Sequence, residues 1–150
     1  MSGASRLDPV LRYREILLRR TEISLEQARS QLESVRKRML ELESERENGL
    51  SSLEDEGVSL EWKVVCYEFL YSLSARFEGE KVRFEEALRI FEDSRSLWEA
   101  ASQETKKVLL LIEEESREQK RSERIREERR LDDRETLRWS RSSRNSGGSL

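Results

Sequence analysis

The side chains of this chain that could do chemistry are carboxylates, guanidinium and ammonium groups, and a single thiol. The 150 residues include 32 acidic and 29 basic residues, one cysteine and no histidine. Without histidine, the chain lacks the usual general base, the commonest zinc ligand and the partner of a Ser-His or Cys-His nucleophile. The six glycines form no GxGxxG or GxxxxGKS/T phosphate loop. We therefore expect no enzyme, with no catalytic residue, metal ligand or bound cofactor.

Charge is abundant but balanced, which limits the classes of partner. Charged residues make up 41% of the chain, yet the net charge is only −3 and the two signs are interleaved. A nucleic-acid-binding surface needs a basic excess, which only the final Arg138, Arg141 and Arg144 approach, so we expect no nucleic acid partner. No apolar run reaches ~18 residues, so we expect neither a signal peptide nor a direct membrane span.

The elements that position these charges are indicated by a seven-residue apolar repeat in the second half of the chain. One row of the repeat is large and mostly aromatic, and a row of mostly smaller residues follows it three positions later. This a/d pattern is typical of helices that supercoil against each other. The large row is Leu70, Phe77, Phe84, Phe91, Trp98, Thr105 and Ile112, and the small row is Leu73, Glu80, Ala87, Ser94, Ala101 and Val108.

The first half of the chain carries a matching repeat. Its main row is Leu11, Leu18, Leu25, Leu32 and Met39, and Ala28, Val35 and Leu42 lie three positions after the last members of that row. At the N-terminal end the corresponding positions hold Arg14 and Thr21, so the apolar seam is thinner there. We interpret the two repeats as two helices that pack against each other.

Local signals predict the helix ends. Asp8 is expected to cap the first helix, with Pro9 at its first position. We expect this helix over about 9–55, a turn over about 56–59 and a second helix over about 60–139. Gly57 is the expected left-handed residue after the first helix, and Ser59 is the expected N-cap of the second, with Glu61 in its first turn.

Two other expectations concern the turn and the chain ends. A break at Asn48-Gly49 is an alternative position for the turn, because glycine weakens a helix interior. Residues 1–6 and 140–150 are small and polar, so we expect them to be disordered.

The length of the repeats favours a hairpin within one chain. A turn centred near residue 57 pairs residue i with about residue 115 − i, so the aromatic row ends at Ile112 just where the first helix runs out. Its next heptad positions, Gln119, Arg126 and Asp133, are polar. We therefore predict an all-α fold, a long antiparallel two-helix coiled-coil hairpin that is monomeric and carries a C-terminal single-helix overhang.

Cys66 lies one heptad before Leu73 on the small row. This position favours a buried packing role for its thiol. A reactive thiol is the alternative, but Cys66 has no histidine beside it and only Lys63 lies near it in the sequence.

Four short motifs, in this order, resemble those of the FliJ family of the bacterial flagellar type III export apparatus, to which the YscO-type injectisome proteins are similar. The resemblance covers about residues 7–139. The motifs are Leu7, Val10, Leu11, Arg14 and Glu15; then Tyr67, Phe69, Leu70 and Leu73; then Glu104, Lys106 and Leu111; and finally Arg129, Leu131, Asp132 and Asp133.

The resemblance implies a non-enzymatic central stalk of the export ATPase hexamer. Such a protein is cytoplasmic and recruited to the cytoplasmic face of the cell membrane, where it also meets secretion chaperones and the cytosolic domain of the export-gate membrane protein. Carried over by position, Phe69 and Leu73 would face the gate or chaperones, although Leu73 is also a seam residue and packing is the stronger interpretation for it. The residues that would face the ring are Arg12, Arg14, Glu15, Leu131, Asp132 and Asp133.

The implied function is to promote assembly of the ATPase ring and to couple ATP hydrolysis to protein export. A generic structural coiled coil, acting as a scaffold or chaperone, is the main alternative. The equivalent stalk of a virulence injectisome is another, since the motifs do not separate the two systems.

Overall fold

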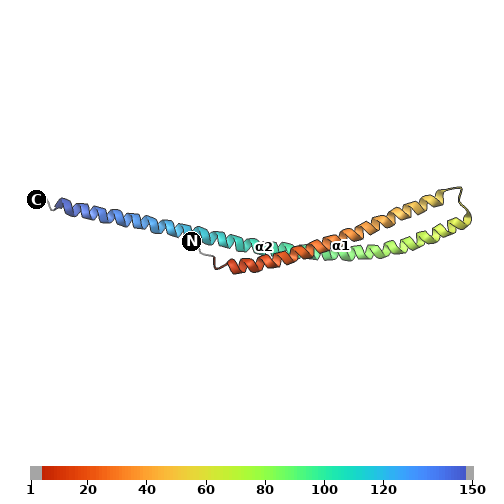
Figure 1. Cartoon of the computed structure of the whole chain (residues 1–150), viewed down its shortest axis with the longest axis horizontal. Coiled ribbons are helices and arrows are strands. Elements are labelled where there is room, and N and C mark those ends of the chain that lie inside the picture. The colour runs from red at the N-terminus through yellow and green to blue at the C-terminus, as the bar shows by residue number, and fades with distance from the viewer. Residues whose placement is uncertain (1–4, 148–150) are drawn as a thin grey trace. The chain divides into compact units, whose positions relative to one another are not determined.

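The computed structural model describes residues 5–147 and contains two helices (Figure 1). Helix α1 runs over Asp8–Glu54 and helix α2 over Leu60–Gly147, and no strand occurs among the described residues. The two helices pack together in opposite directions. The prediction of an all-α helical hairpin is therefore confirmed.

The described residues fall into two compact units. Residues 12–105 form the larger unit, in which most of α1 lies beside the first half of α2. Residues 5–11 together with 106–147 form the other.

In the larger unit the core is a single seam of heptad positions. Val35 and Leu73, each only 2% exposed, are its most deeply buried residues. The large residues of the seam are only half-buried, because an interface between two helices covers one side of a bulky side chain and leaves the other in water. The buried apolar residues of this unit are Ala28, Leu32, Val35, Cys66, Leu73 and Ala87; the half-buried ones on the two long rows are Leu18, Leu25, Met39, Leu70, Phe77, Phe84, Phe91 and Trp98.

The smaller unit pairs the start of α1 with a short part of α2. Val108 is buried, and Leu7, Leu11 and Ile112 are half-buried. Beyond Glu115 the side chains of α2 are exposed as far as Gly147, with the exception of Ser140. This stretch is a solvated single helix, and ion pairs such as that between Glu113 and Arg117, 3.8 Å apart at i,i+4, support the turns before it.

Asp8 is the first residue of α1 and not its cap. A turn closed by Ser5 precedes the helix: the backbone N–H of Leu7 donates to the Ser5 hydroxyl over 3.2 Å, and the N–H of Asp8 donates to the Ser5 carbonyl over 3.0 Å. The helix therefore begins one residue earlier than predicted. The Ser5 hydroxyl also donates to Glu115 over 2.9 Å, which orders a residue expected to be disordered. Residues 1–4 lie outside the described part of the chain.

The turn is built around Asp55 and contains no left-handed glycine. Among the described residues no glycine has a positive φ, so the expected left-handed conformation of Gly57 is wrong. The Gly57 N–H instead donates to the Asp55 carboxylate over 3.4 Å, and the Val58 N–H donates to the Asp55 carbonyl over 3.4 Å. An Asp side chain that accepts from the backbone two residues on can close such a turn without glycine's special freedom. The Ser59 cap is confirmed, since its hydroxyl accepts the Trp62 N–H over 3.3 Å.

The alternative break at Asn48-Gly49 is wrong, because α1 continues through it to Glu54. Gly49 occupies a seam position, one heptad after Leu42, and a Cβ atom there would lie 2.9 Å from Cδ2 of Leu70. Glycine at this position therefore permits a close approach between α1 and α2.

The register of the hairpin differs from the predicted pairing. Arg38 was expected to face residue 77, but its guanidinium lies 4.0 Å from the carboxylate of Glu80. Gly49 similarly meets Leu70, ten positions after the start of α2 but only five before the end of α1. The first turns of α2 therefore reach beyond the last turn of α1 (Figure 1). A symmetric turn was assumed, whereas the non-helical residues 55–59 join two helix ends that are offset from each other.

Helix α2 also ends later than expected. It continues to Gly147, so residues 140–147 of the expected disordered tail are helical, and residues 148–150 lie outside the described residues. No proline or glycine interrupts residues 81–146. In the last turn the Ser146 hydroxyl donates to the Ser143 carbonyl over 3.1 Å, and Arg144 supplies the positive charge that a helix C-terminus favours.

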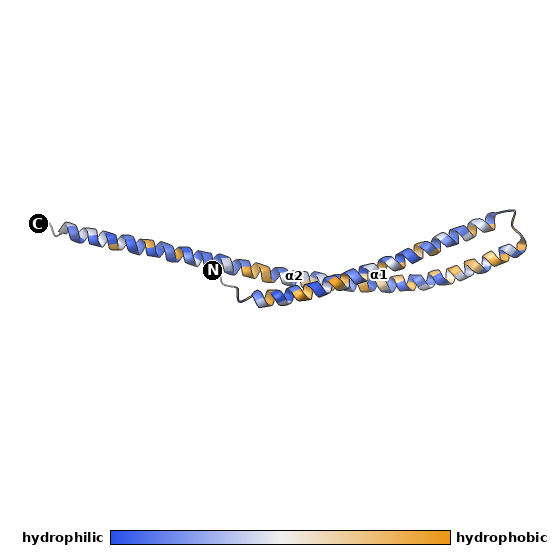
Figure 2. Cartoon of the chain, in the orientation of Figure 1, coloured by the Kyte–Doolittle hydropathy of each residue, from blue (hydrophilic) through white to orange (hydrophobic). Residues whose placement is uncertain are grey.

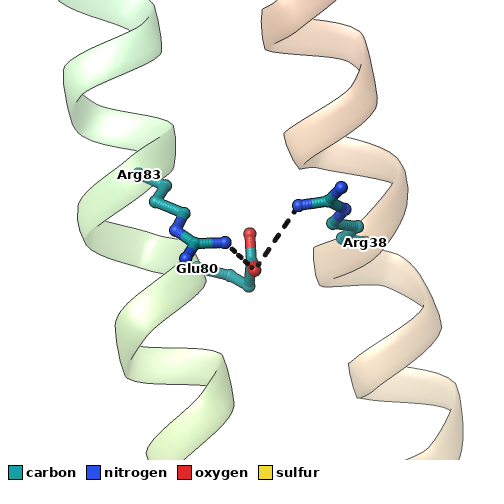
Figure 3. A network of polar contacts seen from close by, with 3 residues as sticks. All are labelled: Arg38, Glu80 and Arg83. Atoms are coloured by element: carbon teal, nitrogen blue, oxygen red, sulfur yellow. Dashed lines mark hydrogen bonds and ion pairs between the residues drawn. The ribbon is translucent and has the colours of Figure 1, made fainter.

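One seam position holds a charge, shown in Figure 3. The side chain of Glu80 is only 14% exposed, and its Oε1 accepts from Arg83 over 3.0 Å while Arg38 of α1 lies 4.0 Å away. Its other oxygen, Oε2, is buried and accepts no hydrogen bond within the described part of the chain. A partly satisfied carboxylate in a helical interface costs stability, although a polar seam residue can help to fix the register.

Replacing Gly79 by alanine should stabilise the hairpin. Gly79 lies in the interior of α2, and a Cβ atom there would meet nothing within 4 Å. We therefore expect the free energy of unfolding to rise by about 1 kcal/mol, the difference in helix propensity between glycine and alanine. Urea denaturation followed by circular dichroism measures this. Gly49→Ala is the matched control: it gains the same propensity but must displace Leu70, so it should stabilise less. A Gly79→Ala variant no more stable than the native chain would contradict the interpretation.

Replacing Glu80 by leucine should also stabilise the hairpin. The leucine removes a poorly satisfied carboxylate, and its two partners stay solvated because the side chains of Arg38 and Arg83 are 57% and 63% exposed. We expect a gain of about 1–2 kcal/mol in the free energy of unfolding, measured by the same denaturation. Glu78→Leu, at an exposed position off the seam, should change it by less than about 0.5 kcal/mol. Destabilisation by Glu80→Leu would show that the charge contributes more than the apolar contact replacing it.

Candidate functional site

The described residues contain no candidate metal site. Among residues 5–147, no three histidine, cysteine, aspartate or glutamate side chains are placed to hold a metal ion. Cys66 is a free cysteine, buried in the seam. Neither helix, over its described length, has a stretch long and apolar enough to cross a membrane. The candidate sites predicted from the sequence are surfaces for partner proteins.

The first set of predicted ring-facing residues lies near the start of α1, in the larger unit. Arg12 and Glu15 are exposed, whereas Arg14 is half-buried on the seam. The guanidinium of Arg14 lies 5.9 Å from the centre of the Tyr13 ring, and its Nε is buried without a hydrogen-bond partner in the described structure. The side chains of Arg12 and Glu15 are thus available to a partner, while Arg14 packs partly within the hairpin.

The second set lies on the solvated part of α2, in the smaller unit. Leu131 is 54% exposed, and Asp132 and Asp133 are exposed as well. The Thr136 hydroxyl donates to the backbone carbonyl of Asp132 over 2.8 Å, and not to its carboxylate. An exposed leucine between arginines and aspartates can be recognised by both apolar and ionic contacts. The shallow surface hollow around it is lined by Glu123, Arg126, Glu127, Arg130, Leu131 and Arg134.

The two predicted gate-facing residues differ in burial. Phe69 is 47% exposed, whereas Leu73 is 2% exposed and belongs to the seam. The burial of Leu73 agrees with the packing role that the sequence favoured for it, and its gate contact stays a prediction. A heptad position faces the opposite helix, and this geometry decides its role.

An exposed apolar surface covers two faces of the first turns of α2, and the motif comparison missed most of it. Trp62, Val65 and Phe69 share one face, and the other exposed apolar residues lie on the opposite face. Figure 2 shows that the first turns of α2 are strongly hydrophobic while the adjacent end of α1 is largely hydrophilic. The sequence held a signal for this surface, because apolar residues at nearly every position of a helix exceed what one partner helix can cover. The exposed members are Leu60, Trp62, Val64, Val65, Tyr67, Phe69 and Tyr71.

Part of this surface forms a groove with α1. The groove has a volume of about 420 Å³ and lies between the end of α1 and the start of α2. Buried Cys66 contributes to it, and Gly49, which lacks a side chain, leaves its α1 side open. Its full lining is Glu45, Asn48, Gly49 and Ser52 from α1, and Trp62, Val65, Cys66 and Phe69 from α2.

Comparison with known proteins gives one family. Neither the curated proteins nor the solved structures yield a match to this chain. The family model described as "Flagellar FliJ protein" matches residues 2–144, nearly the whole sequence. Members of this family are structural components of the flagellar export apparatus. The match confirms the resemblance carried by the four short motifs. The two-helix hairpin described above therefore belongs to the FliJ family of flagellar proteins.

Proposed function

We propose that this chain is the non-enzymatic central stalk of a flagellar protein export ATPase. Acting in the cytoplasm at the membrane face, it would bind the ATPase hexamer at one surface and the export gate or secretion chaperones at another. Its role is to promote assembly of the ring and to couple ATP hydrolysis to delivery of export substrates.

The observation that carries this proposal is the solvated part of α2. Apart from Ser140, residues 116–147 of this helix are exposed, although it includes large apolar side chains such as Leu131, Leu137 and Trp139, which is 78% exposed. A helix with polar residues all round and a few isolated apolar ones is suited to a polar-lined channel, where those few act as anchors. Family membership makes the pore of the export ATPase the natural channel.

The mechanism follows from the difference in symmetry between a single helix and a ring of subunits. A single helix has a different side chain on each face, so it contacts the subunits of a ring unequally. Contacts that favour one conformation of a subunit shift its equilibrium toward that state, which couples the stalk to nucleotide turnover. The proposed contacts come from exposed Arg12 and Glu15, from half-buried Arg14, and from Leu131, Asp132 and Asp133 on the solvated helix.

The second surface is proposed to contain Phe69. Its ring is 47% exposed, and aromatic side chains of this kind are common anchors in protein interfaces. Ring and gate contacts would then use separate residues, so a variant can disturb one without the other.

Truncation after Gln119 tests the ring contact. Removal of residues 120–150 should abolish co-purification with the export ATPase and the stimulation of its turnover. The helicity per residue and thermal stability of the paired helices should persist, because residues 120–147 are exposed apart from Ser140 and contribute little to packing. Steady-state ATP hydrolysis with titrated stalk protein measures the effect.

A shorter truncation after Trp139 is the matched control. It removes residues 140–150 and keeps Leu131, Asp132 and Asp133, so most of the stimulation should remain. If the chain shortened after Gln119 still stimulated the ATPase as the full chain does, or if the full chain had no effect while folded, the stalk proposal would be wrong.

A further inference from the structure

The groove at the turn end of the hairpin has one apolar wall and one polar wall. From α2 it presents Trp62 and Val65, each 53% exposed, and Phe69, 47% exposed. From α1 it presents Glu45, Asn48 and Ser52, all exposed. Large aromatic and branched side chains lining a groove, left half in water, are characteristic of a surface that is covered in a complex.

The chain itself covers this surface only in part. The end of α1 lies opposite the groove, but there it presents Gly49, which has no side chain, and exposed polar residues. Over residues 43–54 of α1, only Gly49 and Leu53 are even half-buried. The apolar residues of α2 in the groove nevertheless follow a helical stripe, Trp62, Val65, Cys66 and Phe69, at spacings of i, i+3, i+4 and i+7. A stripe of this spacing is the surface on which a second amphipathic helix packs.

The charge around the groove specifies the partner. Residues 41–68 contain nine acidic and two basic residues, a net charge of −7, and every one of the nine acidic residues is exposed. The whole chain carries only −3, so the rest of it is net positive. The turn end of the hairpin is therefore a strongly negative region within an otherwise balanced molecule, and it attracts positively charged partners.

The same charge argues against a second copy of this chain as the occupant. Two chains that packed groove to groove would bring both acidic regions within about one Debye length, ~8–10 Å, where repulsion is poorly screened. Like charges set against each other across an interface disfavour that pairing.

We infer that this groove binds an amphipathic helix of another protein, with large apolar side chains along one face and lysine or arginine residues beside them. The apolar face would cover Trp62, Val65 and Phe69, and the basic residues would face Glu45 and the neighbouring carboxylates. The inference rests on the proposed function in treating Phe69 as part of a partner-binding surface. It adds the extent of that surface and the chemistry of what it binds.

A pair of synthetic peptides tests the inference on the full chain. Each has about 18 residues, enough for a helix of several turns, with leucine at i, i+3, i+4 and i+7. One carries lysine at the remaining positions and the other carries glutamate. Fluorescence anisotropy of the labelled peptides should show the basic one binding at least about tenfold more tightly, with a preference that shrinks as salt rises from ~50 to ~500 mM.

Two adjacent valines supply a matched pair of variants. Val65 lines the groove and is 53% exposed, whereas Val64 is 52% exposed and lies outside it. Val65→Asn should weaken binding of the basic peptide by roughly fivefold or more, because it removes apolar contact without changing charge. Val64→Asn should change it by less than about twofold. Glu45→Gln, in the groove, should likewise weaken binding more than Glu43→Gln, outside it.

The helical circular dichroism signal shows whether each variant remains folded, and Phe69→Ser replaces Val65→Asn if that variant loses helicity. Equal binding of the two peptides, no binding of either, or equal effects of the two valine variants would overturn the inference. Self-association of the chain that Val65→Asn abolishes would overturn it too, by making a second copy the occupant. No export ATPase is present in these measurements, so their failure is distinct from failure of the stalk proposal.

Discussion

The close approach of α1 and α2 along one seam is the contact on which the rest of the hairpin depends. Its centre is formed by small or compact side chains such as Ala28, Val35, Leu73 and Ala87, all buried, and at Gly49 a side chain would collide with Leu70. Two helices make only one interface, so there is no deeper layer behind it. The aromatic residues therefore cover the edges of the seam, where they are half in water, and each exposed helical face remains available to a partner.

The seam is uneven along its length, and one of its weak places coincides with the groove. Glu80 inserts a partly satisfied carboxylate, and toward the turn α1 becomes polar while α2 stays apolar (Figure 2). The exposed apolar side chains of Trp62, Val65 and Phe69 do not contribute fully to the stability of the hairpin. Their position beside nine exposed carboxylates is consistent with a surface whose covering helix comes from another protein. At the other end of the chain, the solvated part of α2 is built from balanced charge and needs no partner to remain soluble.

Several sequence predictions failed for one reason. They assumed that neighbouring residues alone decide where a helix ends, and that the two helices meet symmetrically at the turn. Asp8 was expected to cap α1, but it is the first helical residue, and Ser5 closes the preceding turn while its hydroxyl also reaches Glu115. The turn was assigned a left-handed glycine, yet an Asp55 carboxylate closes it. The pairing was taken to be symmetric about residue 57, whereas Arg38 meets Glu80 instead of residue 77. Each outcome depends on a contact between residues or on chain geometry that intrinsic propensity does not specify.

The sequence by itself determined the helical class, the two seams and the family. A period of seven requires one helical face to be apolar whatever the partner, and the order of four motifs pointed to the FliJ family, which the family comparison then showed. Only the tertiary structure decided that Arg38 meets Glu80, and that α2 reaches past α1. Both features depend on the register between the two helices. If one helix were shifted along the other by a few residues, the heptad pattern of the sequence would be unchanged, but different side chains would remain in water.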